Sequence, residues 1–180
     1  MPIEENANMG EGIEIEEYNN LVKRVERNLL PLAVNGKYMI IEFADQEIPS
    51  IALNIFYELQ LLGYVPIIAN SEINSDFRCN PTKLYRFVAK GALVQIDESS
   101  IIGRKGKSVK KFVMKLCKHN LVHFVSSNID DFADNLFFSK MANNYLRKKF
   151  PSHFVNYLQE NAKHVRNGDF FHTRTPIKFK

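Results

Sequence analysis

The chain has 180 residues, a hydrophobic fraction of 45% and a charged fraction of 24%, which are typical values for one soluble globular domain. Its 24 Lys and Arg against 20 Asp and Glu give a net charge of +4, too small a surplus to indicate nucleic-acid binding. No apolar stretch has the length of a membrane span, and the acidic N-terminus lacks the blocks of a signal peptide. We therefore expect a cytoplasmic protein without membrane insertion, with Cys79 and Cys117 as reduced thiols.

Apolar runs alternate with amphipathic stretches along most of the chain. The runs predict strands at 37–43, 64–69, 92–96 and 121–127, with a weaker fifth strand at 12–15. Helical periodicity predicts helices at 48–63, 82–91, 107–120, 129–150 and 153–165. This alternation indicates one α/β domain with a parallel sheet, either a barrel or an open doubly wound sheet. We expect 1–11 to be a disordered N-terminal segment, 12–166 to form the domain and 167–180 to be a polar, basic tail.

Two motifs for phosphate chemistry fail on spacing. Residues 98–108 end like a phosphate-binding loop, but Ile101 occupies the position that requires glycine. A cysteine-based phosphatase needs Cys and Arg six positions apart, whereas Cys79 and Arg86 are seven apart. We therefore interpret the cysteines as bystanders.

The histidines and lysines between residues 107 and 123 can also be interpreted as ordinary surface residues. His119 and His123 are spaced like the ligands of a zinc helix, but a helix-to-strand turn falls between them, so we interpret both as surface histidines. The segment 107–120 places its apolar residues on one stripe, and its five lysines fall elsewhere on the helix. We interpret these lysines as a solvated face and not as a phosphate-binding patch.

Polar side chains follow the predicted strands where each one ends. Glu14, Glu42, Asn70 and Ser126 stand at four such ends, and Asp130 comes shortly after the last. In a barrel these ends converge on one rim, where Glu14, Glu42 and Asp130 could coordinate a hard cation. Strands must also end somewhere, and polar residues are common there, so both interpretations stay open at this point.

Several long segments resemble one known family from about Gly12 to about Gly168. These segments are LPLAVNGKYMIIEF, IFYELQLLGYVPIIANSEIN, LYRFVAKGALVQIDESSIIGRKGKSVKKFVMKLCKHNLVHFVSSN and, more loosely, LQENAKHVRNG. They are similar to the PHP-superfamily protein tyrosine phosphatases of bacterial capsule and exopolysaccharide loci. The resemblance implies a distorted TIM-like barrel of parallel strands and outer helices, with metal ions, usually manganese, at its C-terminal rim. It also implies hydrolysis of phosphotyrosine on the tail of a bacterial tyrosine kinase.

The resemblance assigns roles to individual positions of the first part of this rim. Glu14 and Glu42 match two metal ligands of the family, and Glu72 is also retained. Asn70 stands where the family has a metal-binding His, and Ile73 stands where it has the Arg that contacts phosphate. An amide offers a metal only a neutral oxygen, and an isoleucine cannot hydrogen-bond to phosphate.

Further departures lie at both ends of the domain. Asn128 and Asp130 stand where the family has an Asp and a His that both bind metal. The residues before Gly12 contain no counterpart of the family's opening His-x-His strand. We therefore expect an N-terminally truncated, partial barrel that lacks its first strands.

Three functional hypotheses follow. The first is a degenerate member of the family without useful phosphatase activity, in which manganese binding is doubtful. The second is an active phosphatase completed by a separately encoded N-terminal part. The third is a pseudophosphatase that binds the kinase, using the retained segment 91–100 and the lysine-rich helix as a surface. Exposed strand edges also lead us to expect self-association.

Overall fold

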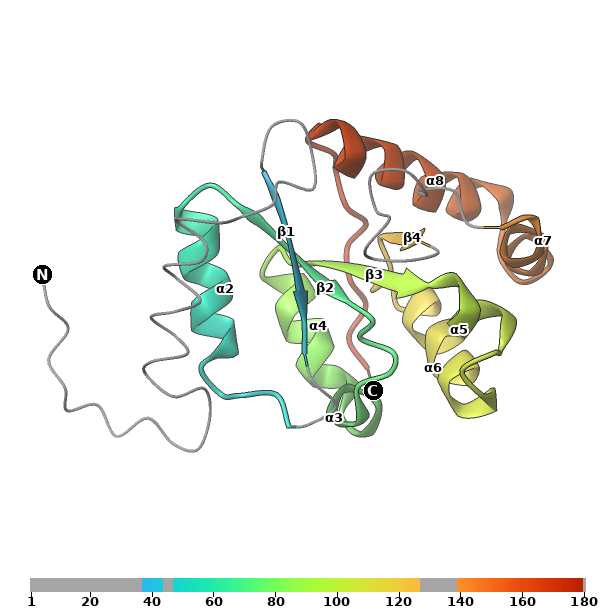
Figure 1. Ribbon diagram of the computed structural model, residues 1–180, viewed down its shortest axis with the longest axis horizontal. Helices are drawn as coiled ribbons and strands as arrows, with labels where there is room; N and C mark the ends of the chain where they lie inside the picture. The colour runs from blue at the N-terminus through green and yellow to red at the C-terminus, as the bar shows by residue number, and fades with distance from the viewer. Residues whose placement is uncertain (1–36, 44–46, 127–138, 180) are drawn as a thin grey trace, which may run out of the picture.

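The computed structural model describes residues 37–43, 47–126 and 139–179 (Figure 1). Strands and helices alternate over the first two thirds of this range, and two helices and an extended tail follow. The elements in order are β1 (Tyr38–Glu42), α2 (Ala52–Leu61), β2 (Val65–Ala69), α3 (Ser75–Cys79), α4 (Pro81–Ala89), β3 (Leu93–Asp97), α5 (Glu98–Ile102), α6 (Lys107–Lys118), β4 (Phe124–Ser126), α7 (Lys140–Lys149) and α8 (Ser152–Asn167).

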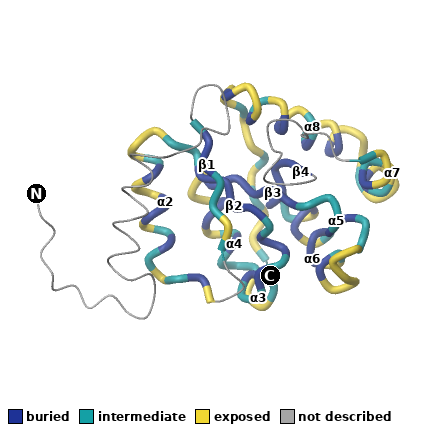
Figure 2. Tube along the Cα trace, in the orientation of Figure 1, coloured by how far each residue is buried: buried dark blue, intermediate teal, exposed yellow. Residues whose placement is uncertain are grey.

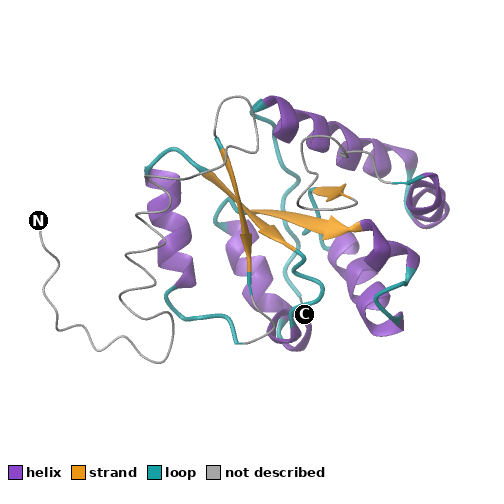
Figure 3. Cartoon of the chain, viewed as in Figure 1, coloured by secondary structure: helices purple, strands orange, loops and turns teal. Residues whose placement is uncertain are grey.

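The four strands form one parallel sheet in the order β1-β2-β3-β4 (Figure 3). Their sequences are short runs rich in branched apolar residues, as expected for strands that are covered on both faces. The pairing sets Glu42 beside Ala69, and Asp97 beside Ser126. The expected α/β fold of parallel strands and outer helices is therefore confirmed, and all four carboxyl ends lie at one edge of the sheet.

Each face of the sheet has its own apolar layer. On one face, Ile68, Val94 and Val125 belong to the main core, together with side chains from the crossover helices α2, α4 and α6. On the other face, strand residues pack against Ala162 and Val165 of α8. Figure 2 shows the strands as the most buried part of the chain.

Four phenylalanines pack together beneath the loops at the carboxyl edge. The ring of Phe87 in α4 lies 4.7 Å from Phe56, 5.9 Å from Phe43 and 6.1 Å from Phe77, centroid to centroid. Because Phe43 directly follows β1 and Phe77 belongs to α3, this cluster anchors the segments that leave β1 and β2.

The boundaries of several elements differ from the sequence prediction. The predicted strand 121–127 shortens to β4, and two five-residue helices, α3 and α5, were not predicted. Helix α5 follows β3 directly, and α3 follows β2 after the turn at 70–74. Each begins with a side chain that caps it: Asn74 accepts from the Phe77 N–H, and Asp97 accepts from the Ser99 N–H. Five residues are too few for helical periodicity to be recognised. The predicted strand at 12–15 and the first part of the helix at 129–150 lie outside the described residues.

The C-terminal tail is a loop, as predicted, but it packs closely against the domain. After α8 ends at Gly168, with φ of +75°, the Tyr38 hydroxyl donates to the carbonyl of Asp169. Further along, the Ile177 N–H donates to the His119 carbonyl over 2.8 Å, and the rings of His119 and Phe179 stack 4.0 Å apart. The tail therefore connects the start of β1 with the end of α6.

No helix among the described residues is long and apolar enough to cross a lipid bilayer.

Candidate functional site

The candidate site is the edge of the sheet where the four strands end. Glu42 closes β1, Asn70 follows β2, and Ser126 closes β4. Gln95 lies in β3, two residues before its end, and is buried. We call these four residues the rim row.

One chain of hydrogen bonds runs through the rim row from β1 to β4. The side-chain amide of Asn70 donates to Glu42 Oε1 over 2.8 Å, and the backbone N–H of Asn70 donates to Gln95 Oε1 over 3.2 Å. The Gln95 amide in turn donates to Ser126 Oγ over 2.9 Å. Each bond crosses between adjacent strands, so the row joins all four carboxyl ends through neutral donors.

The backbone at Asn70 sets the direction of its side chain. Its φ of +52° lies in the left-handed region, which Asn tolerates better than most residues other than Gly. The Ile73 N–H donates to the Asn70 carbonyl over 3.0 Å, which closes a turn immediately after β2. The turn holds the Asn70 amide nitrogen toward Glu42, while its Oδ1 is buried without a hydrogen-bond partner.

Glu72, in the turn after β2, is fully buried. Its Oε1 accepts from the Asp97 N–H over 3.0 Å, which ties the turn after β2 to the end of β3. Burial raises the pKa of this carboxyl to about 7, although the Ser100 hydroxyl and the Asp97 N–H favour the ionised form. Neither Glu72 Oε2 nor Ser100 Oγ has a hydrogen-bond partner of normal geometry. Glu72 therefore serves to hold the turn after β2 against the end of β3.

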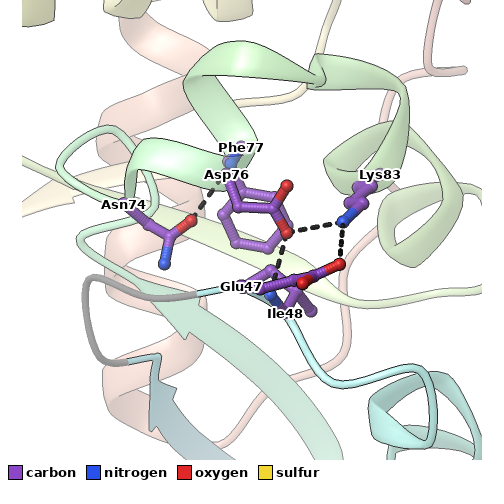
Figure 4. Close-up of polar contacts among 6 residues, drawn as sticks. All are labelled: Glu47, Ile48, Asn74, Asp76, Phe77 and Lys83. Carbon is purple, nitrogen blue, oxygen red and sulfur yellow. Dashed lines mark hydrogen bonds and ion pairs between the residues drawn. The ribbon is translucent and has the colours of Figure 1, made fainter. Parts of the chain in front are cut away.

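The loop after β1 is held by a carboxylate of α3 (Figure 4). Asp76 Oδ2 accepts from the Ile48 N–H over 2.8 Å and from Lys83 Nζ over 2.7 Å, and Lys83 also lies 3.7 Å from Glu47 Oε1. Burial alone would raise the pKa of Asp76, but the bonds from Lys83 and Ile48 outweigh it and hold the pKa below its usual value. We call Asp76, Lys83 and the Ile48 N–H the loop clamp.

His123 corrects a sequence prediction. It was expected at the surface, but it is fully buried, and its Nδ1 accepts from the Val94 N–H over 2.9 Å. Burial lowers the pKa of His123 to about 3, so the ring is neutral at physiological pH. The turn before β4 places His123 beside β3, where its ring satisfies a backbone N–H of that strand. A buried neutral ring in this position is part of the core.

The structure separates the two cysteines. Cys117 is buried in α6, and burial raises the pKa of its thiol to about 12, so it is not an available nucleophile. Cys79 is exposed at the end of α3.

The predicted site residues fall into three groups. Glu42 and Asn70 are brought together, and Ile73 lies partly exposed in the turn that follows. Glu72 is withdrawn into the interior. Glu14, Asn128 and Asp130 lie outside the described residues. Sequence reasoning missed Gln95, although a polar residue inside the apolar run ALVQI was the available signal.

The described part of the rim does not fit a divalent metal centre. Asp97, the carboxylate that closes β3, already accepts the Ser99 N–H through its Oδ1. The rim row itself offers one carboxylate, two neutral amides and a hydroxyl, and one oxygen of that carboxylate already accepts an amide N–H. A cation on this oxygen would have to displace the amide and would find only a neutral oxygen on Asn70. Within the described ranges, no group of three His, Cys, Asp or Glu residues is placed to hold a metal ion.

Comparison with known proteins places the chain in a family. The family described as "Capsular polysaccharide synthesis, CpsB/CapC" matches residues 2–166. The chain is 38% identical to the tyrosine-protein phosphatase YwqE of Bacillus subtilis over 84% of this chain and 60% of that protein. It is 31% identical to the putative tyrosine-protein phosphatase CapC of Staphylococcus aureus over 94% of this chain and 64% of that protein.

A solved structure shows the same fold. It comes from the crystal structures of YwqE from B. subtilis and CpsB from Streptococcus pneumoniae, which are described as metal-dependent tyrosine phosphatases. The match has a TM-score of 0.76 and 36% identity, and it covers 93% of this chain and 66% of that one. The chain spans less than two thirds of the length of the two curated relatives. The family match over residues 2–166, with the agreement in fold, shows that the chain belongs to the CpsB/CapC family of capsular polysaccharide synthesis proteins.

Proposed function

We propose that this chain is a catalytically silent member of its family, whose described rim does not support metal-dependent hydrolysis of phosphotyrosine. The hydrogen bond from the Asn70 amide to Glu42 Oε1 carries this proposal, because it pairs the one carboxylate of the rim row with a neutral donor.

Metal-dependent hydrolysis of a phosphate monoester makes two demands on such a rim. Clustered cations must activate a water molecule, and positive charge must neutralise the phosphoryl oxygens. The row from Glu42 to Ser126 supplies neither a second anionic ligand nor a positive side chain. Ile73, at the end of the turn, contributes an apolar side chain that cannot accept or donate a hydrogen bond.

The direct test is release of inorganic phosphate from a phosphotyrosine peptide in the presence of manganese. B. subtilis YwqE serves as the positive control, and EDTA is added to a parallel reaction of each protein. We expect release by YwqE and none above background by this chain. Turnover by this chain that requires manganese and stops with EDTA would refute the proposal.

A second candidate function is a binding module for a tyrosine-phosphorylated protein, such as a cytoplasmic bacterial tyrosine kinase. The observation that favours it is the retained architecture: the sheet, the loop clamp and the anchored tail are all present, although the described part of the rim has no set of metal ligands. Pull-down with a phosphorylated and an unphosphorylated kinase tail tests it. Capture of the phosphorylated tail alone is expected, and equal or no capture of the two tails would contradict it.

A further inference from the structure

Two packed helices and one turn carry a large share of the positive charge of this chain. The turn before α6, α6 itself and α7 contain eleven of the 24 Lys and Arg residues and none of the 20 Asp and Glu residues. All but Lys110 are exposed. We call this set the α6–α7 basic surface; it comprises Arg104, Lys105, Lys107, Lys110, Lys111, Lys115, Lys118, Lys140, Arg147, Lys148 and Lys149.

The tertiary structure joins these residues, which lie in two separate segments of the sequence. Helix α5 packs against both α6 and α7 (Figure 1). The ammonium group of Lys110 lies 3.8 Å above the centre of the Tyr145 ring, which connects α6 directly with α7. Helical spacing places Lys148 and Lys149 on the same side of α7 as Tyr145. Figure 2 shows the turn before α6 and much of α7 as exposed.

Within the described residues, no acidic side chain pairs with this surface. None of its members forms an ion pair with the described part of the chain: Arg147 bonds to two neutral asparagines, and Lys110 reaches the Ile102 carbonyl. The neighbouring Glu98 of α5 is already engaged, because it accepts the N–H of Ser139 at the start of α7. The rest of the chain has 13 basic and 20 acidic residues, so the charge asymmetry of the molecule points toward an anionic partner.

The chemistry of the surface favours a phosphorylated peptide over a membrane or a nucleic acid. The apolar stripe of α6, including Val109, Phe112 and Leu116, is turned into the core, so α6 presents no apolar face to a bilayer. Tyr145 is covered by Lys110 and does not offer an open ring on which a base could stack. Lysine binds phosphate as a compact point charge on a flexible stem, so it can follow a phosphate group without a fixed geometry.

We propose that the α6–α7 basic surface docks an acidic peptide segment that carries phosphotyrosine. Helix α5 links this surface to the rim, because it begins at Glu98, directly after Asp97 at the end of β3, and packs against both α6 and α7. This inference rests on the proposed binding function, and it adds the place of binding and the charge of the ligand.

The experiment measures fluorescence anisotropy of a fluorescein-labelled acidic peptide with several phosphotyrosines, in EDTA and at low salt. The unphosphorylated peptide, duplex DNA and vesicles of phosphatidylglycerol and phosphatidylcholine are compared as competitors. The test variant is Lys107→Gln/Lys111→Gln/Lys148→Gln. Its matched control is Arg86→Gln/Lys90→Gln/Arg166→Gln, which removes the same charge from exposed sites elsewhere.

We expect the phosphorylated peptide to bind more tightly than the unphosphorylated one, and the test variant to weaken binding by roughly tenfold while the control stays close to wild type. Equal loss in both variants, or no preference for phosphorylation, would overturn the proposal. Stronger competition by DNA or by vesicles would overturn the choice of partner. Phosphate release in the presence of manganese is measured separately, and it tests only the proposal that the chain is catalytically silent. The docking proposal and the proposal of catalytic silence can therefore fail independently.

Discussion

Asn70 and Glu42 stand at the carboxyl ends of adjacent strands, and the Asn70 amide donates a 2.8 Å hydrogen bond to the Glu42 carboxylate. The parallel register brings them together, since Glu42 pairs with Ala69 and Asn70 follows at once. The left-handed backbone at Asn70 then turns its amide toward the carboxylate. The neutral amide nitrogen of Asn70 therefore lies on a side of the Glu42 carboxylate from which a cation could otherwise approach.

Asn70→Asp is expected to reverse this arrangement. It removes the donor and sets two carboxylates side by side, so the free energy of unfolding in EDTA should fall by about 1–2 kcal/mol. Manganese should restore part of that loss, because a cation can bridge the two carboxylates. Urea denaturation with EDTA and with manganese measures both effects. Asn70→Ala is the control, since it loses the donor without adding a ligand. A wild-type protein that manganese itself stabilises would contradict this account of the rim.

Because of Glu72, we expect the free energy of unfolding to fall as pH rises. The carboxyl has a pKa of about 7 in the folded protein and close to 4.5 in the unfolded chain, so the folded state binds the extra proton between these values. Its contribution to stability is therefore complete below about pH 4.5 and is lost as pH rises through 7. Glu72→Gln should remove this dependence and raise the free energy of unfolding near pH 8 by up to about 3 kcal/mol. Chemical denaturation across this pH range measures it, and parallel curves for the two proteins would exclude it.

Because of His123, we expect the free energy of unfolding to rise with pH in a lower pH range. Its pKa is about 3 when folded and close to 6.5 when unfolded, so the unfolded state binds the extra proton in between. Stability should fall as pH drops from about 6.5 toward 3. His123→Asn keeps an acceptor for the Val94 N–H but does not titrate, so its stability should lose this slope despite a smaller side chain. His119→Asn, at a partly exposed histidine, is the comparison and should retain the slope.

We expect substitutions of two neighbouring carboxylates, Asp76 and Glu47, to change the free energy of unfolding by different amounts. Asp76→Ala should lower the free energy of unfolding by about 2 kcal/mol, because it removes the acceptor of both the Ile48 N–H and Lys83. Glu47→Ala should change it by less than about 0.5 kcal/mol, since Glu47 is exposed and lies 3.7 Å from the same lysine. Thermal denaturation of the two variants provides the comparison. Equal effects would show that the clamp does not hold the loop.

Residues with one possible environment were predictable, and residues with two were not. The branched apolar runs at β1, β2 and β3 are shielded from water only inside a buried sheet. The apolar stripe from Val109 to Cys117 is shielded only when it packs against a core. His123 can be a surface residue or a buried acceptor, and only the position of the Val94 N–H decides between these. Glu72 likewise followed a strand end but turned inward to the Asp97 N–H.

The sequence by itself determined the alternation of strands and helices, the parallel sheet and the place of Glu42 and Asn70 at its carboxyl edge, because apolar periodicity is a local property of the chain. The tertiary structure decided which donors and acceptors meet: Asn70 with Glu42, Gln95 with Ser126, and Asp76 with Lys83. It also placed α7 beside α6, so that the lysines interpreted as one solvated helix face become part of a larger basic surface. These pairings join residues that are distant in the chain, and only strand register and helix packing bring them within reach.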